Sequence, residues 1–457
     1  MAERTASPRI VVFLDHTAKW SGGEIALLRT LTALDPARVT PVVVLAEAGT
    51  LADRLHEARI ETHILPLSGG AREVRKDTLG GGALVRHAGA GVAFLRYAVA
   101  VAQFAKKRGA FALHCNSLKS DLYGALAGRL AGIPVIWHVR DHIDPSYLPA
   151  PAVRALRSLA RSAPTFVVAI SDSVLEKLFP DPADRARQLA SRARVIHDGL
   201  SDQELTTPLP APTDRWKNDP PRVGMIGRFV AWKGQHIFLE AAQKLQNRQK
   251  AGNNGETGQT GDTVPGQEHD AAREAVFVLV GKPMFGEAEY EAELRRIAAP
   301  LGEGVEFLGF QSDIPAVLHD LDIFVHSSTT PEPFGQVVIE AMAEGVPVIA
   351  SDGGGVREII EQDVSGLRTP MGDADALAEA LRGLLNDPAR ASRLARAGHT
   401  RVRADFTAAR NARGIEAVYD DLAAASRRFS RRSPSRDEAE PRTSSGTTTA
   451  PPPNTVH

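Results

Sequence analysis

The sequence predicts an α/β protein made of two successive doubly wound units, and three observations support this fold class. Short β-branched runs alternate with longer helical patterns along most of the chain, which is typical of βαβ units and parallel sheets. A proline-rich connector at 206–221 interrupts the alternation, because its prolines disfavour both helix and sheet. The length of 457 residues suffices for two substantial cores at roughly 150 residues per domain.

The first unit is predicted from short apolar runs separated by segments with helical spacing. Strands buried on both faces of a parallel sheet are expected to form such nearly continuous apolar runs. The predicted strands are 10–14, 39–45, 62–65, 112–116, 135–138, 165–170 and 195–196. The clearest predicted helices are 24–33, 91–108 and 121–131. We expect a domain over 1–206.

The second unit repeats this pattern after the connector and is expected over 207–404. Its predicted strands are 222–226, 275–280, 305–307, 323–325 and 347–350. Two segments have too few apolar residues to bury a core, an insertion at about 247–274 and the tail at 426–457, and both are predicted to be disordered. In doubly wound sheets, ligands bind at the carboxyl ends of the strands, so the site is expected in a cleft between the two domains.

Composition excludes several classes of function. The 54 basic and 55 acidic side chains nearly cancel, so no overall field attracts nucleic acid, and no nucleic-acid partner is expected. A single cysteine, Cys115, excludes a disulfide framework and a cysteine-built zinc site, and we interpret it as a buried strand residue. No stretch approaches the roughly 18 apolar residues of a membrane-spanning helix, and no signal peptide is evident, so a cytoplasmic location is expected.

The most informative segment is 327–360, which carries two glutamates and a predicted helix start. Glu332 lies in a loop, and Glu340 lies about two turns into the helix that begins at Phe334 or Gly335. The free N–H groups of that helix start form a site for a diphosphate, and carboxylates accept hydrogen bonds from sugar hydroxyls. The glycines around Gly354 permit a second close approach of backbone to ligand. The alternative is that both glutamates are ordinary solvated acids.

This segment resembles the retaining glycosyltransferases of family 4. Their pattern is two glutamates separated by seven residues, as Glu332 and Glu340 are, followed by a Gly-Val-Pro-Val strand and a Gly-Gly turn. The resemblance implies a GT-B fold, in which two Rossmann-like domains face each other across a central cleft and a closing helix, here about 405–425, packs back on the first domain. It also implies that Glu340 binds the nucleotide ribose and that Glu332 contacts the donor sugar.

A second element of the same family follows the connector. Arg228 and Lys233 lie five residues apart after a predicted strand, in a Gly-Arg and Lys-Gly context that resembles the family's. Two cations in this position can neutralise a leaving diphosphate as its charge develops. In the family the leaving phosphate helps to deprotonate the acceptor, so the resemblance implies neither a metal nor a cofactor.

The first domain contributes weaker candidates. A turn with Gly22 and Gly23 follows the first strand, where family members place a loop that contacts the donor; the alternative is a tight turn without a ligand. His138 is expected at the end of its strand, where a family histidine contacts the donor sugar, although a lone histidine is often structural. Asn116 and Ser171 are expected at similar strand ends.

Two neighbouring stretches extend this edge. Arg140, Asp141 and His142 follow His138 and are predicted to face the acceptor. Asp198 departs from the family, which commonly has Asn before the glycine; Asp tolerates the same turn, but a contact specific to the amide is in doubt.

The sequence therefore predicts a metal-independent, retaining transferase that moves a sugar from a nucleoside-diphosphate donor to a glycan, lipid-linked or small-molecule hydroxyl. The alternatives are a nucleotide-sugar epimerase of the same shape and a binding protein without catalysis. Residues 1–207 carry 26 basic and 20 acidic side chains. This excess, with the basic end of helix 91–108, permits weak peripheral contact with the inner face of an anionic membrane; the competing interpretation is a solvated surface.

Overall fold

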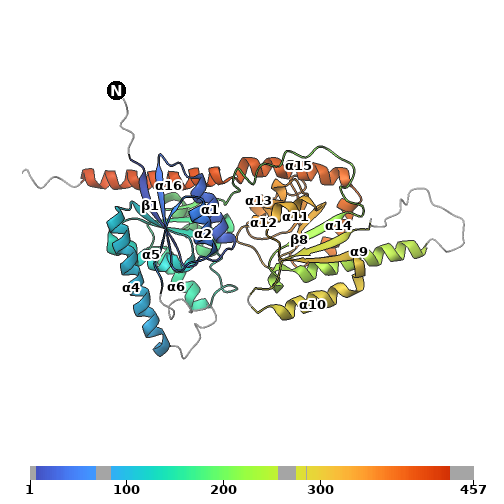
Figure 1. The fold of residues 1–457 in the computed structure, drawn as a ribbon, viewed down its shortest axis with the longest axis horizontal. Helices are drawn as coiled ribbons and strands as arrows, with labels where there is room; N and C mark the ends of the chain where they lie inside the picture. The colour runs from blue at the N-terminus through green and yellow to red at the C-terminus, as the bar shows by residue number, and fades with distance from the viewer. Residues whose placement is uncertain (1–6, 68–83, 256–273, 285, 433–457) are drawn as a thin grey trace, which may run out of the picture. The chain divides into compact units, whose positions relative to one another are not determined.

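The computed structural model describes residues 7–67, 84–255, 274–284 and 286–432, and it contains two parallel sheets (Figure 1). The first sheet has the strand order β3-β2-β1-β4-β5-β6-β7, and the second has the order β10-β9-β8-β11-β12-β13. Every paired strand is parallel to its neighbours. The predicted fold class of two doubly wound domains is confirmed.

In the first sheet the strand order reverses next to the first strand. The strands are β1 (Arg9–Asp15), β2 (Val39–Leu45), β3 (Glu61–Ile64), β4 (Ala112–Cys115), β5 (Val135–Val139), β6 (Phe166–Ala169) and β7 (Ala193–Val195). Because β1 lies between β2 and β4, the loops after β1 and β4 separate at their carboxyl ends, which is where such sheets bind ligands. The Gly22–Gly23 turn and Asn116 follow these two strands.

The second sheet has the same arrangement around its first strand. Its strands are β8 (Arg222–Ile226), β9 (Val276–Val280), β10 (Val305–Gly309), β11 (Ile323–His326), β12 (Val348–Ser351) and β13 (Leu367–Thr369). The order reverses between β8 and β11. Arg228 and Lys233 follow β8, and Glu332 follows β11. These predicted site residues therefore lie at the switch point of the sheet, the place where its strand order reverses.

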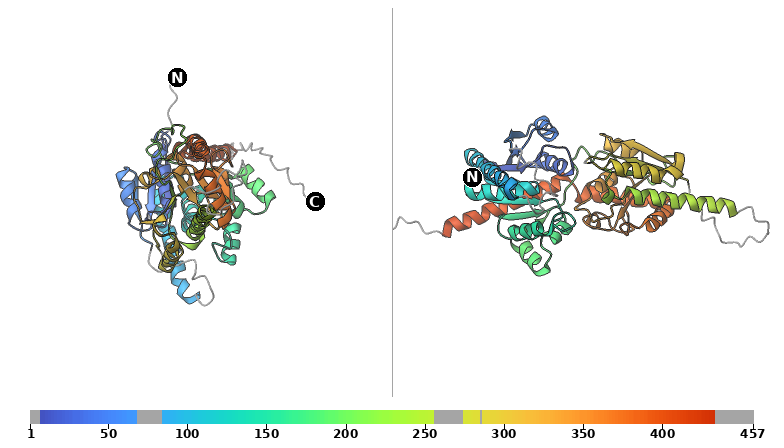
Figure 2. Two further views of the ribbon diagram at one scale, coloured as in Figure 1. Left: turned by 90° about the vertical axis from the view of Figure 1, so that its right-hand side faces the viewer. Right: turned by 90° about the horizontal axis from the view of Figure 1, so that it is seen from below.

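Helices connect the strands and cover the sheets (Figures 1 and 2). In the first domain they are α1 (Gly22–Ala33), α2 (Thr50–Glu57), α4 (Leu84–Arg108), α5 (Leu118–Ala131), α6 (Ala150–Ala160), α7 (Asp172–Leu178) and α8 (Pro182–Ser191). Beyond the connector they are α9 (Gln235–Gly255), α10 (Ala288–Ala298), α11 (Ile314–His319), α12 (Gln336–Ala343), α13 (Val356–Ile359), α14 (Ala374–Leu385), α15 (Pro388–Asp405) and α16 (Ala408–Arg432), with short 3₁₀ helices η2 (Ala231–Lys233) and η3 (Ala299–Gly304).

The strands form because their residues can be buried on both faces. Val11, Val12, Phe13 and Leu14 of β1 are fully buried, as are the side chains of most central strands. Figure 1 shows α4 and α5 on one side of β1 and α1 and α2 on the other. Cys115 is buried at the end of β4, as predicted. No helix of the described chain is both long enough and apolar enough to cross a membrane.

Three segments differ from the sequence prediction. The strand β13 was not predicted, because its three residues Leu-Arg-Thr give no apolar run. Helix α9 continues to Gly255, into the segment predicted as an insertion, since Gln, Arg, Lys and Ala at 248–251 favour helix. Helix α16 continues to Arg432, past the predicted start of the tail. The remainder of both segments, 256–273 and 433–457, lies outside the described residues.

Contacts divide the chain into a large unit that ends at Glu416 and a second that begins at Ala417, within α16. In the large unit, the start of α16 is hydrogen-bonded to the first domain. Asn411 Nδ2 donates to the His197 carbonyl over 2.8 Å, and Glu416 Oε1 accepts from the Asp35 N–H over 2.7 Å. For 417–425, packing against the first domain stays a prediction.

Candidate active site

The edge of the second sheet brings Lys233 and Glu332 together. Lys233 Nζ lies 2.6 Å from Glu332 Oε1, although the two residues belong to loops after different strands. Gly234 makes this possible, because its φ is +77° and a Cβ atom there would lie 1.9 Å from the Ser327 carbonyl oxygen. Only glycine lets the lysine loop lie this close to the loop that leads to Glu332.

Two further side chains donate hydrogen bonds to Glu332. His326 Nε2 lies 2.8 Å from Glu332 Oε1, and Ser328 Oγ donates to the same oxygen. Burial alone would raise the pKa of Glu332, but Lys233 and His326 hold it well below its ordinary value. Glu332 is therefore a fixed negative charge at neutral pH, next to the cation that was predicted to bind a diphosphate.

Arg228 lies at the same edge, after β8, and is close to Glu287. Its Nη2 is 3.9 Å from Glu287 Oε1, and its side chain is 29% exposed. Gln235 Nε2 donates to the Arg228 carbonyl over 2.8 Å, which ties the strand end to the start of α9. The guanidinium is thus partly exposed at the edge of the sheet that also carries Lys233 and Glu332.

The helix start predicted at Phe334 or Gly335 lies one residue later. Gly335 is the N-cap of α12 with φ +117°, and the helix begins at Gln336. Phe334 is 3% exposed, and its ring stacks on His197 with centroids 5.9 Å apart. The Phe334 side chain is therefore part of the core, and a ligand at this helix start would meet backbone N–H groups.

Glu340 faces the first domain. Its Oε1 accepts a hydrogen bond from Arg29 Nη2 over 2.8 Å, and Arg29 also donates to Glu204. Arg29 is only 8% exposed. Burial would lower the pKa of Arg29, but the two carboxylates raise it, so the guanidinium is always charged. A ribose at Glu340 would share this carboxylate with Arg29 or displace it.

The predicted glycine turn begins helix α1. Ser21 is the N-cap, so Gly22 and Gly23 lie in the first turn of the helix and not in a loop before it. Gln336 Nε2 donates to the Gly22 carbonyl over 2.9 Å, and a Cβ on Gly23 would lie 3.7 Å from Arg140 Cδ. The structure thus brings the two predicted donor-binding helix starts, those of α1 and α12, into contact.

His138 lies deeper than the sequence indicated. Strand β5 continues through Val139, so His138 is inside the strand, 1% exposed, with Nδ1 3.0 Å from His114 Nε2. Its Nε2 has no hydrogen-bond partner among the described residues. Burial, together with Arg140 and His114, lowers the pKa of His138 well below its ordinary value, so the ring is neutral. The residue that emerges first from the strand is Arg140.

A chain of polar contacts follows from Arg140. Arg140 Nε donates to Asn116 Oδ1 over 2.8 Å, and Asn116 Nδ2 donates to Asp15 Oδ2 over 2.7 Å. Arg140 Nη1 contacts both oxygens of Asp198 at 2.7 and 2.8 Å. This explains the departure from the family at Asp198: the carboxylate balances a guanidinium that is 7% exposed. It also gives Asn116 a structural partner at the predicted strand end.

Ser171 and Gly354 both support the loop of Glu332. Ser171 accepts from the Val174 N–H as the N-cap of α7, and its hydroxyl donates to the Pro333 carbonyl over 2.6 Å. Gly354 has φ +63°, and a Cβ there would lie 1.9 Å from the Glu332 carbonyl oxygen. Their predicted contact with a ligand stays a prediction, whereas their contact with this loop is direct.

Two Asp-x-Asp stretches, 320–322 and 373–375, serve the fold. Asp322 accepts from the N–H groups of Lys217 and Arg222, and Asp373 is the N-cap of α14. Among the described residues, no group of three or more His, Cys, Asp or Glu side chains is arranged to hold a metal ion.

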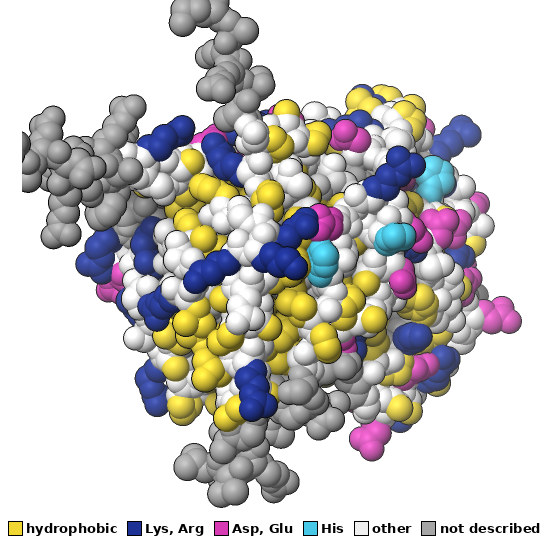
Figure 3. All heavy atoms as spheres, turned by 60° about the vertical axis from the view of Figure 1, so that its left-hand side comes forward, with side chains coloured by type: hydrophobic (Ala, Val, Ile, Leu, Met, Phe, Trp, Pro, Cys, Tyr) yellow, Lys and Arg dark blue, Asp and Glu magenta, His cyan; other side chains and the backbone are white. Residues whose placement is uncertain are grey.

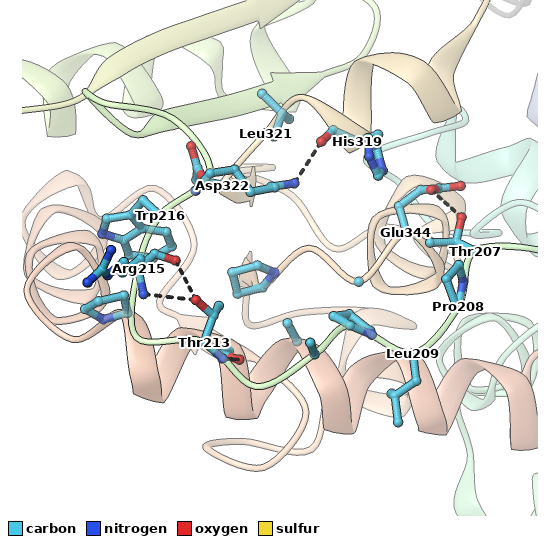
Figure 4. A pocket seen from close by; sticks show the side chains of 18 residues that line it. Thr207, Pro208, Leu209, Thr213, Arg215, Trp216, His319, Leu321, Asp322 and Glu344 are labelled. Carbon is cyan, nitrogen blue, oxygen red and sulfur yellow. Dashed lines mark hydrogen bonds between the residues drawn. The ribbon is translucent and has the colours of Figure 1, made fainter.

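A pocket of about 470 Å³ lies at the other edge of the second sheet (Figure 4). Asp322 and Pro347 in its wall directly precede β11 and β12, so the pocket is at the amino ends of the strands. The connector covers it with Leu209 and Trp216, and Thr207 Oγ1 donates to Glu344 Oε2 over 2.7 Å. None of the predicted site residues lines this pocket.

Sequence reasoning missed His326, Ser328 and Arg29. The first two lie at the end of β11 and just beyond it, and the strand-end argument that selected Asn116 would have selected them as well. Arg29 lies in the middle of a helix, 311 positions from Glu340, and nothing in its local sequence indicates that contact.

Comparison with known proteins matches both domains. Residues 21–192 match the family model described as Glycosyl transferase 4-like domain, and residues 212–401 match the model described as Glycosyl transferases group 1. The chain is 30% identical over 191 residues to the lipopolysaccharide core biosynthesis glycosyltransferase LpsE of Rhizobium meliloti (strain 1021), a match that covers 41% of this chain and 46% of LpsE. The chain therefore spans about half the length of that relative.

Two further similarities are longer. The D-inositol 3-phosphate glycosyltransferase 1 of Catenulispora acidiphila is 27% identical over 330 residues, 67% of this chain and 71% of that protein. The crystal structure of Anabaena HepE in complex with UDP and glucose is 25% identical, with a TM-score of 0.68 over 90% of this chain and all of that one. With both of its domains matched by family models, the chain belongs to the family-4 glycosyltransferases of the GT-B fold.

Proposed function

We propose that this chain transfers a sugar, with retention of anomeric configuration, from a nucleoside-diphosphate donor to a hydroxyl of a glycan, lipid-linked or small-molecule acceptor. The observation that carries the proposal is the Lys233–Glu332 contact of 2.6 Å at the switch point of the second sheet. It puts a cation for phosphate beside a carboxylate for sugar hydroxyls. The solved complex of HepE with UDP and glucose, to which this chain is similar, supports a nucleotide-sugar ligand.

In this proposal each site residue of the second domain contacts one part of the donor. Lys233 and the accessible Arg228 neutralise the diphosphate, whose charge grows as the glycosidic bond breaks. The N–H groups at the start of α12, after Gly335, contact the same phosphates. Glu332 accepts hydrogen bonds from the sugar, and Glu340 accepts them from the ribose.

The reaction needs no residue that changes its protonation state. The bond between the anomeric carbon and the diphosphate oxygen breaks, the acceptor oxygen attacks from the same face, and its proton moves to the departing phosphate. Such a front-face step retains configuration and requires neither a base nor a metal. The low pKa of Glu332 agrees with a role as a permanent anion and not as an acid.

The first domain supplies the acceptor side. Arg140 begins this edge, with Asp141 and His142 after it, and His142 Nε2 lies 3.0 Å from Ser173 Oγ. His138 is buried beneath Arg140, so direct contact with the donor sugar would require its partnerless Nε2 to face the ligand. We propose that His138 contacts the donor sugar, on the basis of the family resemblance.

The experiment is a panel of UDP-, GDP- and ADP-sugars incubated with the full chain in EDTA, with release of nucleoside diphosphate measured. We expect turnover of at least one donor without metal, and a product whose anomeric configuration, read by proton NMR, is that of the donor. Loss of all turnover in EDTA with recovery on adding Mg²⁺ would contradict the metal-free step, and an inverted product would contradict retention.

Two alternatives have distinct outcomes in the same assay. A nucleotide-sugar epimerase would change the donor sugar in the absence of any acceptor, which chromatography of the remaining donor would reveal. A binding protein without catalysis would bind a nucleotide sugar, raising its melting temperature, and yet release no diphosphate.

We further propose weak peripheral contact with the inner face of an anionic membrane through α4. Val92 and Leu95 are each 50% exposed and Val99 is 37% exposed, so three aliphatic side chains lie on one outer face of this helix. Lys106 and Lys107 follow on the same face, and the helix has no acidic residue. Figure 3 shows basic side chains among hydrophobic ones on the side of the molecule where α4 lies in Figure 1.

Vesicle co-sedimentation tests this contact. We expect binding of the full chain to vesicles that contain phosphatidylglycerol and little binding to pure phosphatidylcholine, with Lys106→Glu/Lys107→Glu reducing it about ten-fold, at roughly 1 kcal/mol or less per charge. The matched control is Arg54→Glu in α2. Equal binding to both vesicle types, or to none, would exclude an electrostatic membrane contact.

A further inference from the structure

The hydrogen bonds of Glu332 are concentrated on one of its two oxygens. Oε1 is contacted by Lys233 Nζ at 2.6 Å, by His326 Nε2 at 2.8 Å and by Ser328 Oγ. Oε2 accepts no hydrogen bond from the described part of the chain. It is also not fully buried, so a ligand can reach it. Because each carboxylate oxygen has about two lone-pair sites, Oε1 is saturated and Oε2 is the oxygen left for a ligand.

His326 is the most rigid of the three donors. It is the last residue of β11, 4% exposed, and its backbone is registered against Ala350 of β12. Lys233 lies on a flexible four-carbon chain, and Ser328 lies in the loop itself. A ring fixed by a central strand therefore sets where Oε1 is, and hence where Oε2 points.

The chemistry also fixes which nitrogen carries the proton. Glu332 is an ionised carboxylate and can only accept, so His326 Nε2 must be the N–H donor. Nδ1 of the same ring is buried and has no partner among the described residues. A polar atom left unpaired in the core is a cost, and it is explained if the ring is retained for the bond made by its other nitrogen.

We propose that His326, assisted by Ser328, is a positioning residue that fixes Glu332 Oε1 so that Oε2 is directed at the sugar of the donor. This inference rests on the proposed function, because it assigns the sugar to Glu332. It makes a specific demand on affinity. Glu332 contributes binding free energy through the sugar and not through the nucleotide. Loss of His326 should therefore remove the preference of the protein for a nucleotide sugar over the bare nucleotide.

The experiment compares UDP-glucose with UDP as probes, by calorimetric titration and by release of UDP from UDP-glucose. We expect His326→Leu to lower turnover at least ten-fold and to abolish any tighter binding of UDP-glucose, while the Kd for UDP changes less than two-fold. His326→Gln, whose amide N–H replaces Nε2–H, should restore turnover to within about three-fold. The double variant with Glu332→Gln should be no slower than Glu332→Gln alone, because both act on one carboxylate.

The matched control is His399→Gln, another buried histidine of the second domain, which bonds the Thr207 carbonyl and should leave all these values unchanged. If His326→Leu does not fold, Ser328→Ala takes its place, with a smaller expected loss of about three-fold. Crystal structures of the His326 variants test the positioning without any donor: the Glu332 carboxylate should turn in the leucine variant and stay in the glutamine variant.

The outcomes separate this inference from the proposed function. Wild-type protein that turns over none of the donor panel contradicts the proposed function, and the crystal structures then decide the positioning alone. Turnover of His326→Leu equal to wild type, additive losses in the double variant, or an unmoved Glu332 carboxylate would each overturn the role of His326.

Discussion

The two sheets end in polar networks that differ in one respect. In the second domain, Lys233, His326 and Ser328 converge on one oxygen of Glu332 and leave the other without a partner in the described chain. In the first domain, Arg140 links Asp198 to Asn116, and Asn116 bonds Asp15, although the buried Arg140 Nη2 has no hydrogen-bond partner in the described part of the chain. One edge presents charge to a ligand, whereas the other uses charge to hold its own shape.

This difference predicts where substitutions act. Changes at the edge of the second sheet should reduce catalysis, because the ligand is what completes that network, and a change that removes a donor to the buried Glu332 should also lower stability. Changes in the first network should reduce stability, because each member has a buried partner that would be left alone.

The largest expected effect is that of Lys233→Ala on turnover. Removing a cation from a developing diphosphate charge should lower kcat about 100-fold or more, and it should also lower the melting temperature, because Lys233 helps to keep the buried Glu332 ionised. Release of nucleoside diphosphate in EDTA measures this effect. The control is Lys282→Ala, because Lys282 lies over the ring of Phe310, which directly follows the outer strand β10. Full activity of Lys233→Ala would refute the role of Lys233 at the diphosphate.

The next effect is expected from Asp198→Leu on stability. It leaves the guanidinium of Arg140 buried without its carboxylate, which should cost about 3 kcal/mol of unfolding free energy. Asp198→Asn, the residue common in the family, keeps an acceptor oxygen and should cost clearly less. Urea unfolding followed by circular dichroism distinguishes them, and equal stability of the two variants would show that the ion pair does not hold this edge.

The smallest effect concerns acid stability and the pair His114 and His138. Burial, with a contribution from Arg140, lowers the pKa of His114 to about 3, while an unfolded histidine titrates near pH 6.5. The unfolded state therefore binds more protons below about pH 6.5. As the pH is lowered from about 6.5 towards the folded pKa, the free energy of unfolding decreases by about 1.4 kcal/mol per pH unit for each such histidine.

His114→Phe should remove one histidine's share of this slope, and its ring retains the stacking on Phe13. Unfolding midpoints in urea at pH 5, 6 and 7 measure the slope, and His56→Phe, an exposed histidine of α2, should leave it unchanged. An unaltered slope in His114→Phe would mean that this ring is not kept neutral by the fold.

Local pattern was enough to predict much of the second domain. Each motif of this domain spans only a few residues, and it follows a strand that is a continuous apolar run. This holds for Arg228 with Lys233 and for Glu332 with Glu340. The structure brings Lys233 and Glu332 into contact, and both residues were predicted as donor-binding from local motifs, without long-range information.

What could not be predicted depends on contacts between distant segments. Arg29 meets Glu340, and Arg140 meets Asp198, across 311 and 58 positions, and no local spacing encodes either pair. The depth of His138 depended on whether β5 ended at His138 or at Val139, a difference of one residue. Strand ends are set by pairing with neighbours, which the sequence of one strand does not contain.

The most direct measurement is hydrogen–deuterium exchange of the full chain with and without UDP. A nucleotide bound at the switch point of the second sheet should slow exchange at 227–234 and 328–340, and leave 207–217, which covers the pocket of Figure 4, unchanged. Slowed exchange confined to 207–217, or no change at 227–234 and 328–340 with UDP, GDP or ADP, would contradict the assignment of the donor site.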